Sequence, residues 1–318
     1  MYGGGGQQGS GGGQGGQDLN ALYAAAMLAA AEEEQRKKQT YRYLEGLLPL
    51  VLLIILGIFI AAKMGMIDLS FIPGFAKTTK VLILTDNPTA DEIQSLIKVL
   101  TYQYPRNQRI EVATPMVLSP TRRIYASNLA DYDVVILYEV QDKMLSLMQR
   151  QELYNYVKNG GDLIVVLDSG TYMPAFDYYG TPGDQSPVWV GWKDPYMNQI
   201  MPVMCENEAA CTIDSTDRAR IATYMPDHPV MGGIEFYPES KAPLSIRYIP
   251  GIVENKNGTT IADIEILSGT EVSPSAIVTA TYPGIVVSTN ILGGKVIYFN
   301  YEPHKTPILL FNAIAWLS

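Results

Sequence analysis

The sequence has few of the residues from which compact chemical sites are most often built. Only two cysteines and two histidines occur in 318 residues, which excludes a disulfide-built miniprotein and a cysteine-rich zinc or iron–sulfur site. Basic residues are outnumbered, because 23 Lys and Arg stand against 32 Asp and Glu, a formal net charge of −9. Since binding nucleic-acid phosphates needs clustered Lys and Arg, this balance argues against a nucleic-acid-binding protein.

Charge of either sign is scarce, whereas apolar residues are abundant. Charged residues make up 17% of the chain and hydrophobic residues 47%, a composition that excludes disorder along its whole length. A chain of this length allows about two domains, or one large domain with appendages. The composition varies strongly along the chain, and this variation defines the segments that we expect.

The N-terminal region divides into a tail and a helix-forming segment. Ten of the first sixteen residues are Gly, so we expect residues 1–17 to be a flexible Gly/Gln-rich tail unless they pack against a partner. Residues 18–45 are Ala-rich, begin with Asp18 as a candidate N-cap, and place apolar residues at helical spacing. They predict a juxtamembrane helix that lies on the membrane or pairs with another helix.

Residues 46–67 form the longest apolar stretch of the chain. Residues 46–62 carry no charge, and crossing the hydrocarbon core takes about 20 apolar residues, with a terminal Lys63 free to snorkel. A cleaved signal peptide should begin with a short charged region, whereas 45 residues precede this stretch. We therefore expect a single transmembrane anchor at 46–67 and a linker at 68–78.

The orientation of this anchor follows from a small charge difference and two weaker signals. The basic residues that flank the anchor are Arg36, Lys37, Lys38 and Arg42 before it and Lys63, Lys77 and Lys80 after it. Four against three favours a cytoplasmic N-terminus. Cys205 and Cys211 suit a disulfide in an oxidising compartment, and Asn257 begins a glycosylation sequon. We expect the C-terminal body to be extracytoplasmic.

From residue 79 onward the chain alternates between strand and helix patterns. Apolar runs at residues 81–85, 110–113, 133–140 and 162–170 predict strands, and residues 90–103 and 147–158 predict helices. Continuous Val/Ile/Leu runs joined by helices indicate parallel strands that are buried on both faces. We therefore predict an α/β domain over 79–318 with a doubly wound, mostly parallel, flavodoxin-like sheet.

An aromatic- and Pro-rich insertion at residues 171–215 interrupts this alternation. Long stretches without regular structure are uncommon and are usually functional. The aromatic side chains of this insertion would form a lid over a cleft, a surface for a partner, or a small secondary core.

Three segments carry a resemblance to a known family. They read GGDLIVVLDSG at 160–170, DHPVMGGI at 227–234 and GGKVIYFNYEPHKTPILLFNAIAWL at 293–317. Together with the order of elements over about residues 79–318, they resemble the class I glutamine amidotransferase-like fold, in the branch with ThuA-like proteins and related membrane-tethered domains. Amidotransferases need a Cys nucleophile on the turn after the strand that corresponds to residues 163–167, and a downstream His.

In this sequence that turn reads Asp168-Ser169-Gly170, and neither cysteine is near it. The resemblance therefore implies the fold without glutamine hydrolysis. One alternative is a replacement triad, with Ser169 as nucleophile, His304 or His228 as base, and Glu302 as the third member. The alternative is that Asp168 and Ser169 cap the turn by hydrogen bonding its backbone.

In open α/β sheets, ligands gather at the carboxyl ends of the strands. The candidate ligand-binding residues at these ends are Asp86, Asn87, Glu139, Asp168 and Ser169. Asp86, Glu139, Asp168 and His304 would suit a divalent cation, but no short-spaced motif supports a metal site. We expect no cofactor.

Residues 165–171 also fit the Asp-Ser/Thr-Gly signature of aspartic proteases, which need two such loops. The only similar segment, at residues 267–270, lacks the Asp. The parallel-strand context also conflicts with an all-β protease.

These observations predict a single-pass membrane protein whose amidotransferase-like domain is non-catalytic. It would serve as a structural or accessory subunit of a membrane assembly, or as an extracytoplasmic ligand-binding module. Its partners would be membrane lipid and other membrane subunits, and it would not bind nucleic acid. The tail, residues 18–45 and the aromatic insertion would contact these partners. The competing prediction is an extracytoplasmic hydrolase or sugar-modifying enzyme that uses Ser169 with His304 or His228.

Overall fold

The computed structural model describes residues 27, 49, 51–54, 56–57, 78–102, 109–180, 182–239, 242–289 and 293–318. The chain divides into two units, Met1–Phe71 and Ile72–Ser318. The predicted tail, nearly all of the predicted helix at 18–45, most of the predicted anchor and the linker up to residue 77 lie outside the described residues. Within the described part of the chain, no helix combines the length and apolar composition that a membrane crossing needs.

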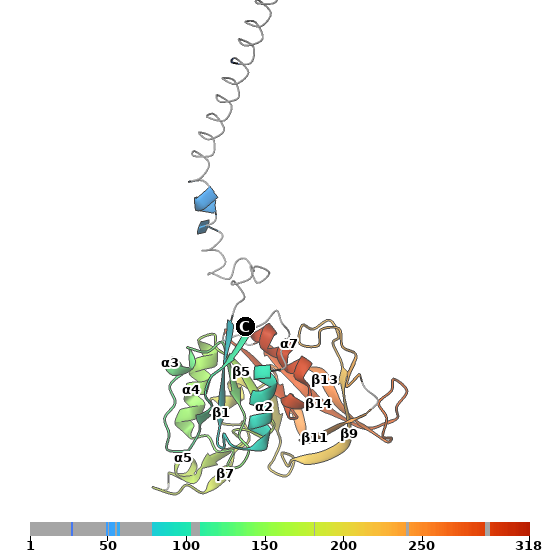
Figure 1. The fold of residues 1–318 in the computed structure, drawn as a ribbon. Helices are drawn as coiled ribbons and strands as arrows, with labels where there is room; N and C mark the ends of the chain where they lie inside the picture. Colours follow the sequence, from blue (N-terminus) through green and yellow to red (C-terminus); the bar gives the residue numbers. More distant parts are fainter. Residues whose placement is uncertain are drawn as a thin grey trace, which may run out of the picture. The chain divides into compact units, whose positions relative to one another are not determined.

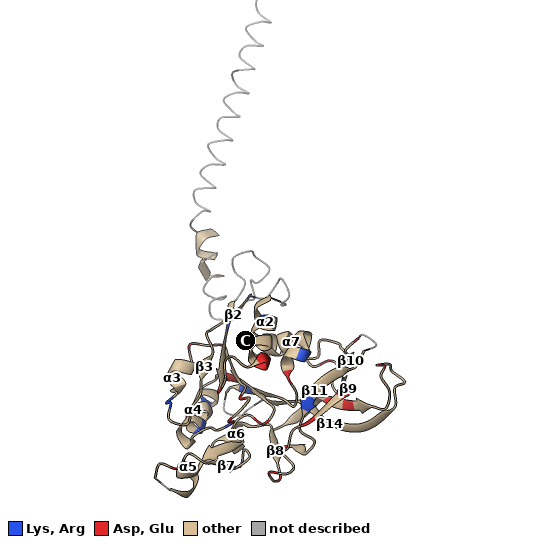
Figure 2. Ribbon diagram, turned by 60° about the horizontal axis from the view of Figure 1, so that its bottom comes forward, with Lys and Arg blue, Asp and Glu red and all other residues tan. Residues whose placement is uncertain are grey.

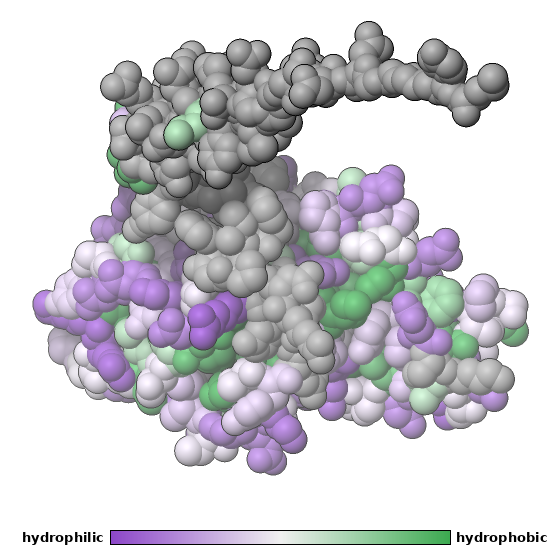
Figure 3. All heavy atoms as spheres, turned by 45° about the horizontal axis from the view of Figure 1, so that its top comes forward, coloured by the Kyte–Doolittle hydropathy of each residue, from purple (hydrophilic) through white to green (hydrophobic). Residues whose placement is uncertain are grey.

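The first unit is described at only a few positions, which fall mainly in the apolar stretch. Residues 51–54 and 56–57 are helical. Their large side chains are all exposed, and Leu53 reaches 70%. The described residues of the second unit present a different surface: the face drawn in Figure 3 is mostly hydrophilic or intermediate, with scattered hydrophobic side chains, as is ordinary for a globular domain.

The second unit is built on a mixed sheet whose centre is largely parallel (Figure 1). Among the described residues the sheet has eleven strands, in the order β10-β9-β13-β14-β15-β5-β4-β1-β2, with β3 beside β1 and β11 beside β9. Its parallel strands are β1 (Thr78–Thr85), β2 (Arg109–Val112), β3 (Met116–Val117), β4 (Val134–Leu137), β5 (Asp162–Val166) and β15 (Lys295–Phe299). The predicted α/β fold is confirmed.

The other half of the sheet is antiparallel, which the sequence pattern did not indicate. It consists of β14 (Val278–Thr289), β13 (Thr259–Leu267), β9 (Asp214–Thr223), β10 (Phe236–Tyr237) and β11 (Leu244–Tyr248). β14 pairs with β15 and so continues the parallel sheet. Only short connections are needed between antiparallel neighbours, and no helix separates these strands in the described residues.

The helices cover both faces of the parallel half. α2 (Asp91–Tyr102) joins β1 to β2, and α4 (Leu147–Lys158) joins β4 to β5. Because such crossovers are right-handed and β2 and β5 lie on opposite sides of the β1–β4 pair, α2 and α4 lie on opposite faces (Figure 1). The strand order therefore reverses between β1 and β4, and the carboxyl ends of these two strands form the topological switch point.

The remaining helices are short, except the last. They are α3 (Ala126–Leu129), α5 (Ala175–Tyr179), α6 (Met197–Ile200), the 3₁₀ helix η1 (Pro303–Lys305) and α7 (Pro307–Leu317). Most of α7 is apolar and it buries six residues. Few residues of the ribbon are coloured as Lys, Arg, Asp or Glu (Figure 2), and the core on the central strands consists largely of Val, Ile and Leu.

The insertion at 171–215 is a set of short elements, and its buried apolar residues from Trp192 onward belong to the main hydrophobic core of the domain. It contains β6 (Tyr172–Pro174), α5, β7 (Pro187–Trp189), α6 and β8 (Val203–Cys205), which pairs with β12 (Ile252–Glu254). Trp192 is buried and packs edge-on against Tyr298, with ring centroids 5.6 Å apart. Tyr178 and Tyr179 are exposed. The aromatic residues thus divide between a core and an open surface.

A buried arginine ties the insertion to the domain. Arg150 of α4 is fully buried and pairs with Asp194 at 2.6 Å. It also donates to the carbonyls of Leu145, Gly170 and Tyr172. Burial lowers the pKa of Arg150, but these four partners occupy four of the five N–H donors of the guanidinium. Such a cluster holds the chain rigidly at the point where the insertion begins.

Candidate functional site

The switch point between β1 and β4 is filled by a side chain of the protein itself. Asp86, which follows β1, accepts hydrogen bonds from the backbone N–H groups of Val140, Gln141 and Asp142 at 2.6–2.7 Å. A carboxylate that accepts three N–H groups has little capacity left for a ligand. The structure therefore gives this predicted ligand residue the role of fixing the loop after β4.

Asn87, another predicted ligand residue, has a local role. Its amide oxygen accepts from the backbone N–H and the hydroxyl of Thr89. This arrangement is the turn that Asn side chains commonly form before a helix. It prepares the start of α2 at Asp91.

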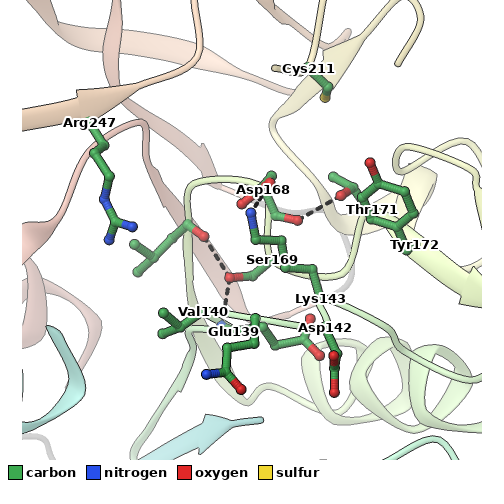
Figure 4. A network of polar contacts seen from close by, with 12 residues as sticks. Glu139, Val140, Asp142, Lys143, Asp168, Ser169, Thr171, Tyr172, Cys211 and Arg247 are labelled. Carbon is green, nitrogen blue, oxygen red and sulfur yellow. Dashed lines mark hydrogen bonds and ion pairs between the residues drawn. The ribbon is translucent and has the colours of Figure 1, made fainter. Parts of the chain in front are cut away.

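Ser169 is buried and both hydrogen-bonding roles of its hydroxyl are used. It donates to the carbonyl of Val166 at 2.7 Å and accepts from the backbone N–H of Glu139 at 2.9 Å (Figure 4). Neither His304 nor His228 is among its hydrogen-bond partners. The turn-capping alternative therefore describes this serine, and the geometry of a Ser–His pair is absent from the described residues.

The strained position after β5 carries leucine. Leu167 has φ 51, the left-handed conformation in which a nucleophile sits on a strand-to-helix turn in α/β hydrolases. We expected the nucleophile position at Asp168-Ser169-Gly170, but β5 ends at Val166 and the sharp turn begins one residue later, at Leu167. Its side chain is 2% exposed and apolar, so it has no nucleophilic atom.

Glu139 is a buried carboxyl under this turn. One of its oxygens accepts from the backbone N–H of Gly170 at 2.7 Å, and the other has no hydrogen-bond partner. Burial raises the pKa of Glu139 to about 8, and the Gly170 N–H opposes this shift. Glu139 is therefore mostly protonated at neutral pH.

Asp168 pairs with a lysine that sequence analysis did not single out. Lys143 Nζ lies 2.6 Å from one carboxylate oxygen of Asp168 (Figure 4). The other oxygen of Asp168 is buried and has no hydrogen-bond partner. Burial raises the pKa of Asp168, and the Lys143 ammonium opposes this. No sequence signal marked Lys143, because it lies 25 residues from Asp168 in a loop without a motif.

Glu302 also has its own partner. Its two oxygens accept from the Nε and the backbone N–H of Arg247 at 2.7 and 2.9 Å. The same guanidinium reaches Glu92 at 3.1 Å and the hydroxyl of Tyr138 at 3.2 Å. This network joins β11, α2 and the end of β4, and Glu302 orients Arg247 rather than a histidine.

The two histidines lie in unrelated surroundings. His304, in η1, has a buried Nδ1 without a hydrogen-bond partner, and burial lowers the pKa of His304 to about 4. His228 accepts from the backbone N–H of Val230 and packs against Trp316 with ring centroids 5.0 Å apart. In the described residues neither contacts an acidic side chain by a hydrogen bond, so neither has the orienting partner of a catalytic base.

The other predicted sites are a disulfide, a glycosylation sequon and a set of candidate metal ligands. Cys205 and Cys211 form a disulfide, with a Cα–Cα distance of 5.7 Å. Asn257 lies half-exposed in a turn. Among the described residues, no three His, Cys, Asp or Glu side chains gather where they could hold a metal ion, and Asp86, Glu139 and Asp168 have the partners given above.

A pocket of about 480 Å³ lies at the opposite, amino edge of the sheet. Its lining includes Asp133, Tyr156 and Asp162. Asp133 accepts from the backbone N–H of Lys80, and Asp162 from that of Lys295. The polar groups of this pocket therefore hold the starts of neighbouring strands together.

Comparison with known proteins gives structural neighbours only. No model of a protein family matches the chain, and no curated protein matches it. The fold is similar to a ThuA-like protein from Parabacteroides merdae ATCC 43184, with 12% identity and a TM-score of 0.48, over 76% of this chain and 90% of that one. A ThuA-like protein from Bacteroides uniformis ATCC 8492 has 14% identity and a TM-score of 0.46, over 76% and 92%.

The chain also resembles part of a β-galactosidase from Bacillus circulans sp. alkalophilus, with 14% identity and a TM-score of 0.43. That match covers 75% of this chain but 30% of the enzyme. ThuA-like proteins are thus among the structural neighbours, and no activity follows from similarities of this size.

Proposed function

We propose that residues 79–318 form a non-catalytic binding domain, amidotransferase-like in fold and without a nucleophile, that serves as a structural or accessory subunit of a membrane assembly. The observation that carries this proposal is the use of the polar side chains at the carboxyl edge. Asp86, Ser169 and Glu302 each bind the protein's own backbone. A catalytic group needs a free, correctly oriented reacting atom, and the turn after β5 offers Leu167 instead.

We further propose that residues 46–67 anchor this domain in a membrane, with the N-terminus cytoplasmic and the domain extracytoplasmic. The support is the uncharged run at 46–62 and the exposure of consecutive apolar side chains at 51–54, since exposed apolar surface of this kind needs a lipid or protein cover. The disulfide between Cys205 and Cys211 supports an oxidising compartment.

The experiment is to purify the full chain in mild detergent and to measure both hydrolysis and assembly. We expect turnover of p-nitrophenyl acetate and p-nitrophenyl galactoside to be the same for the wild type and Ser169→Ala. We also expect the wild type to migrate with other membrane proteins. Turnover that falls in Ser169→Ala and in His304→Ala would establish the competing hydrolase, and a protein that runs as a lone monomer would contradict the assembly role.

A further inference from the structure

Two strained loops meet at a single ion pair. Among the described residues, the only non-glycine residues with positive φ are Lys143, at 52, and Leu167, at 51. Lys143 Nζ pairs with Asp168, the neighbour of Leu167. Left-handed backbone at ordinary residues is unfavourable and gathers at ligand clamps and switch regions. Both strained positions thus border the contact between Lys143 and Asp168.

An independent observation concerns the carboxylate of Asp168. Its side chain is 9% exposed, and the oxygen that does not contact Lys143 is buried without a hydrogen-bond partner. A buried acceptor of this kind is uncommon and calls for an explanation. An ionised carboxylate only accepts hydrogen bonds, so whatever satisfies this oxygen must donate.

The charge of Asp168 itself favours a cationic donor. Lys143 is the cation paired with it. The other two cations nearby are engaged elsewhere: Arg150 pairs with Asp194, and Arg247 with Glu92 and Glu302. The ammonium of Lys143 itself demonstrates the fit of a primary ammonium group to Asp168 at 2.6 Å (Figure 4).

We propose that the turn at residues 167–170 is a binding site for a primary ammonium group, which takes the place of the Lys143 ammonium on Asp168 as the strained loop around Lys143 moves away. The incoming group donates to both oxygens of Asp168, including the one without a partner. This inference rests on the proposed role as a binding domain and names the chemistry of its ligand.

The loop that would move carries the insertion with it. Tyr172 donates its backbone N–H to the carbonyl of Lys143 and accepts from the backbone N–H of Leu145. Its hydroxyl donates to Glu208, in the loop closed by the disulfide. Displacement of Lys143 is therefore transmitted to the exposed insertion, which is the part of the domain that a partner would contact.

Trp192 supplies a reporter for this site. Its indole N–H donates to the carbonyl of Ser169 at 3.0 Å, so the ¹H–¹⁵N signal of this indole reads the conformation of the turn. The signal is assigned with Trp192→Phe. The probe is ethylammonium chloride, and the controls are potassium chloride and tetramethylammonium chloride at equal concentration, because tetramethylammonium carries charge without an N–H donor.

In the wild type we expect a saturable shift of the Trp192 signal with ethylammonium alone. Lys143→Ala removes the competing ammonium, so half-saturation should occur at an about tenfold lower concentration, whereas Asp168→Asn should abolish the shift. Lys193→Ala is the matched control, since Lys193 contacts the Glu206 carbonyl instead, and it should behave as the wild type.

An absent or non-saturable response in the wild type would overturn the proposal, as would an equal response to tetramethylammonium. The wild-type titration tests the proposal even if Lys143→Ala does not fold. Nα-acetyl-lysine methylamide as a second probe separates a peptide lysine from a free small amine as the source of the ammonium. Hydrolytic turnover that depends on Ser169 would refute the proposed function while leaving this titration interpretable.

Discussion

At the scale of single residues, Ser169 is a structural serine. Its hydroxyl accepts the backbone N–H of Glu139 and donates to Val166 inside the core. Ser169→Ala leaves that N–H buried and unpaired, so we expect the free energy of unfolding to fall by about 1–3 kcal/mol. Ser127→Ala is the matched control, because Ser127 is exposed, and it should change stability by less than about 0.5 kcal/mol. Urea unfolding measures both, and equal stability of Ser169→Ala and the wild type would refute this role.

Glu139 should make stability depend on pH. Its pKa is raised to about 8 from an ordinary 4.5, first by burial. Between pH 4.5 and 8 the folded protein therefore keeps a proton on Glu139 that the unfolded chain releases. The contribution of this proton to the free energy of unfolding is complete below about pH 4.5 and is lost as pH rises through about 8. Glu139→Gln, which does not titrate, should lose less stability than the wild type between pH 5 and 8.

The measurement is the urea midpoint of both proteins at several pH values. Glu111→Gln, at an exposed position of β2, should follow the wild-type curve. Parallel curves for the wild type and Glu139→Gln would show that Glu139 is ionised in the folded protein at neutral pH.

The polar residues at the strand ends were predictable, but their partners were not. Asp86, Glu139 and Asp168 could be named because they directly follow apolar runs. Asp86 binds N–H groups 54–56 residues away, and Arg247 lies 55 residues from Glu302. Nothing in the local sequence encodes such pairings, so the sequence could name these residues but could not predict which groups bind them.

At the scale of elements, Arg150 connects α4 to the start of the insertion. Because it is fully buried and paired with Asp194, Arg150→Met should leave an unpaired buried carboxylate and lower the free energy of unfolding by about 3–5 kcal/mol. Arg218→Met is the matched control, since the Arg218–Asp217 pair is exposed and such pairs contribute about 0–1 kcal/mol. Thermal unfolding distinguishes the two, and similar losses would contradict the anchoring role.

The parallel half of the sheet could be predicted because strands buried on both faces read as continuous Val/Ile/Leu runs, as in β4 and β5. The antiparallel half could not. Strands such as β9 mix exposed and buried residues irregularly, and the pairing of β13 with β14 contains register shifts. Their sequences therefore did not show which strands they pair with.

At the scale of the whole molecule, the apolar stretch at 46–67 should hold the protein in a membrane. A charged side chain in the middle of a membrane-crossing helix costs about 2.5–3.5 kcal/mol, so Leu56→Arg should lower the fraction that stays in the membrane pellet after an alkaline carbonate wash. Leu56→Ile is the control and should remain in the pellet. If the wild type itself is released by the wash, the anchor is refuted.

The central claim is that the carboxyl edge of the sheet holds the domain together and performs no nucleophilic chemistry. Treating the full chain with a fluorophosphonate and mapping the adduct by mass spectrometry tests it directly, because this reagent reacts with serines that a base activates. We predict that Ser169 remains unmodified under conditions in which a serine hydrolase added to the same tube is fully labelled. Stoichiometric labelling of Ser169 would contradict the account.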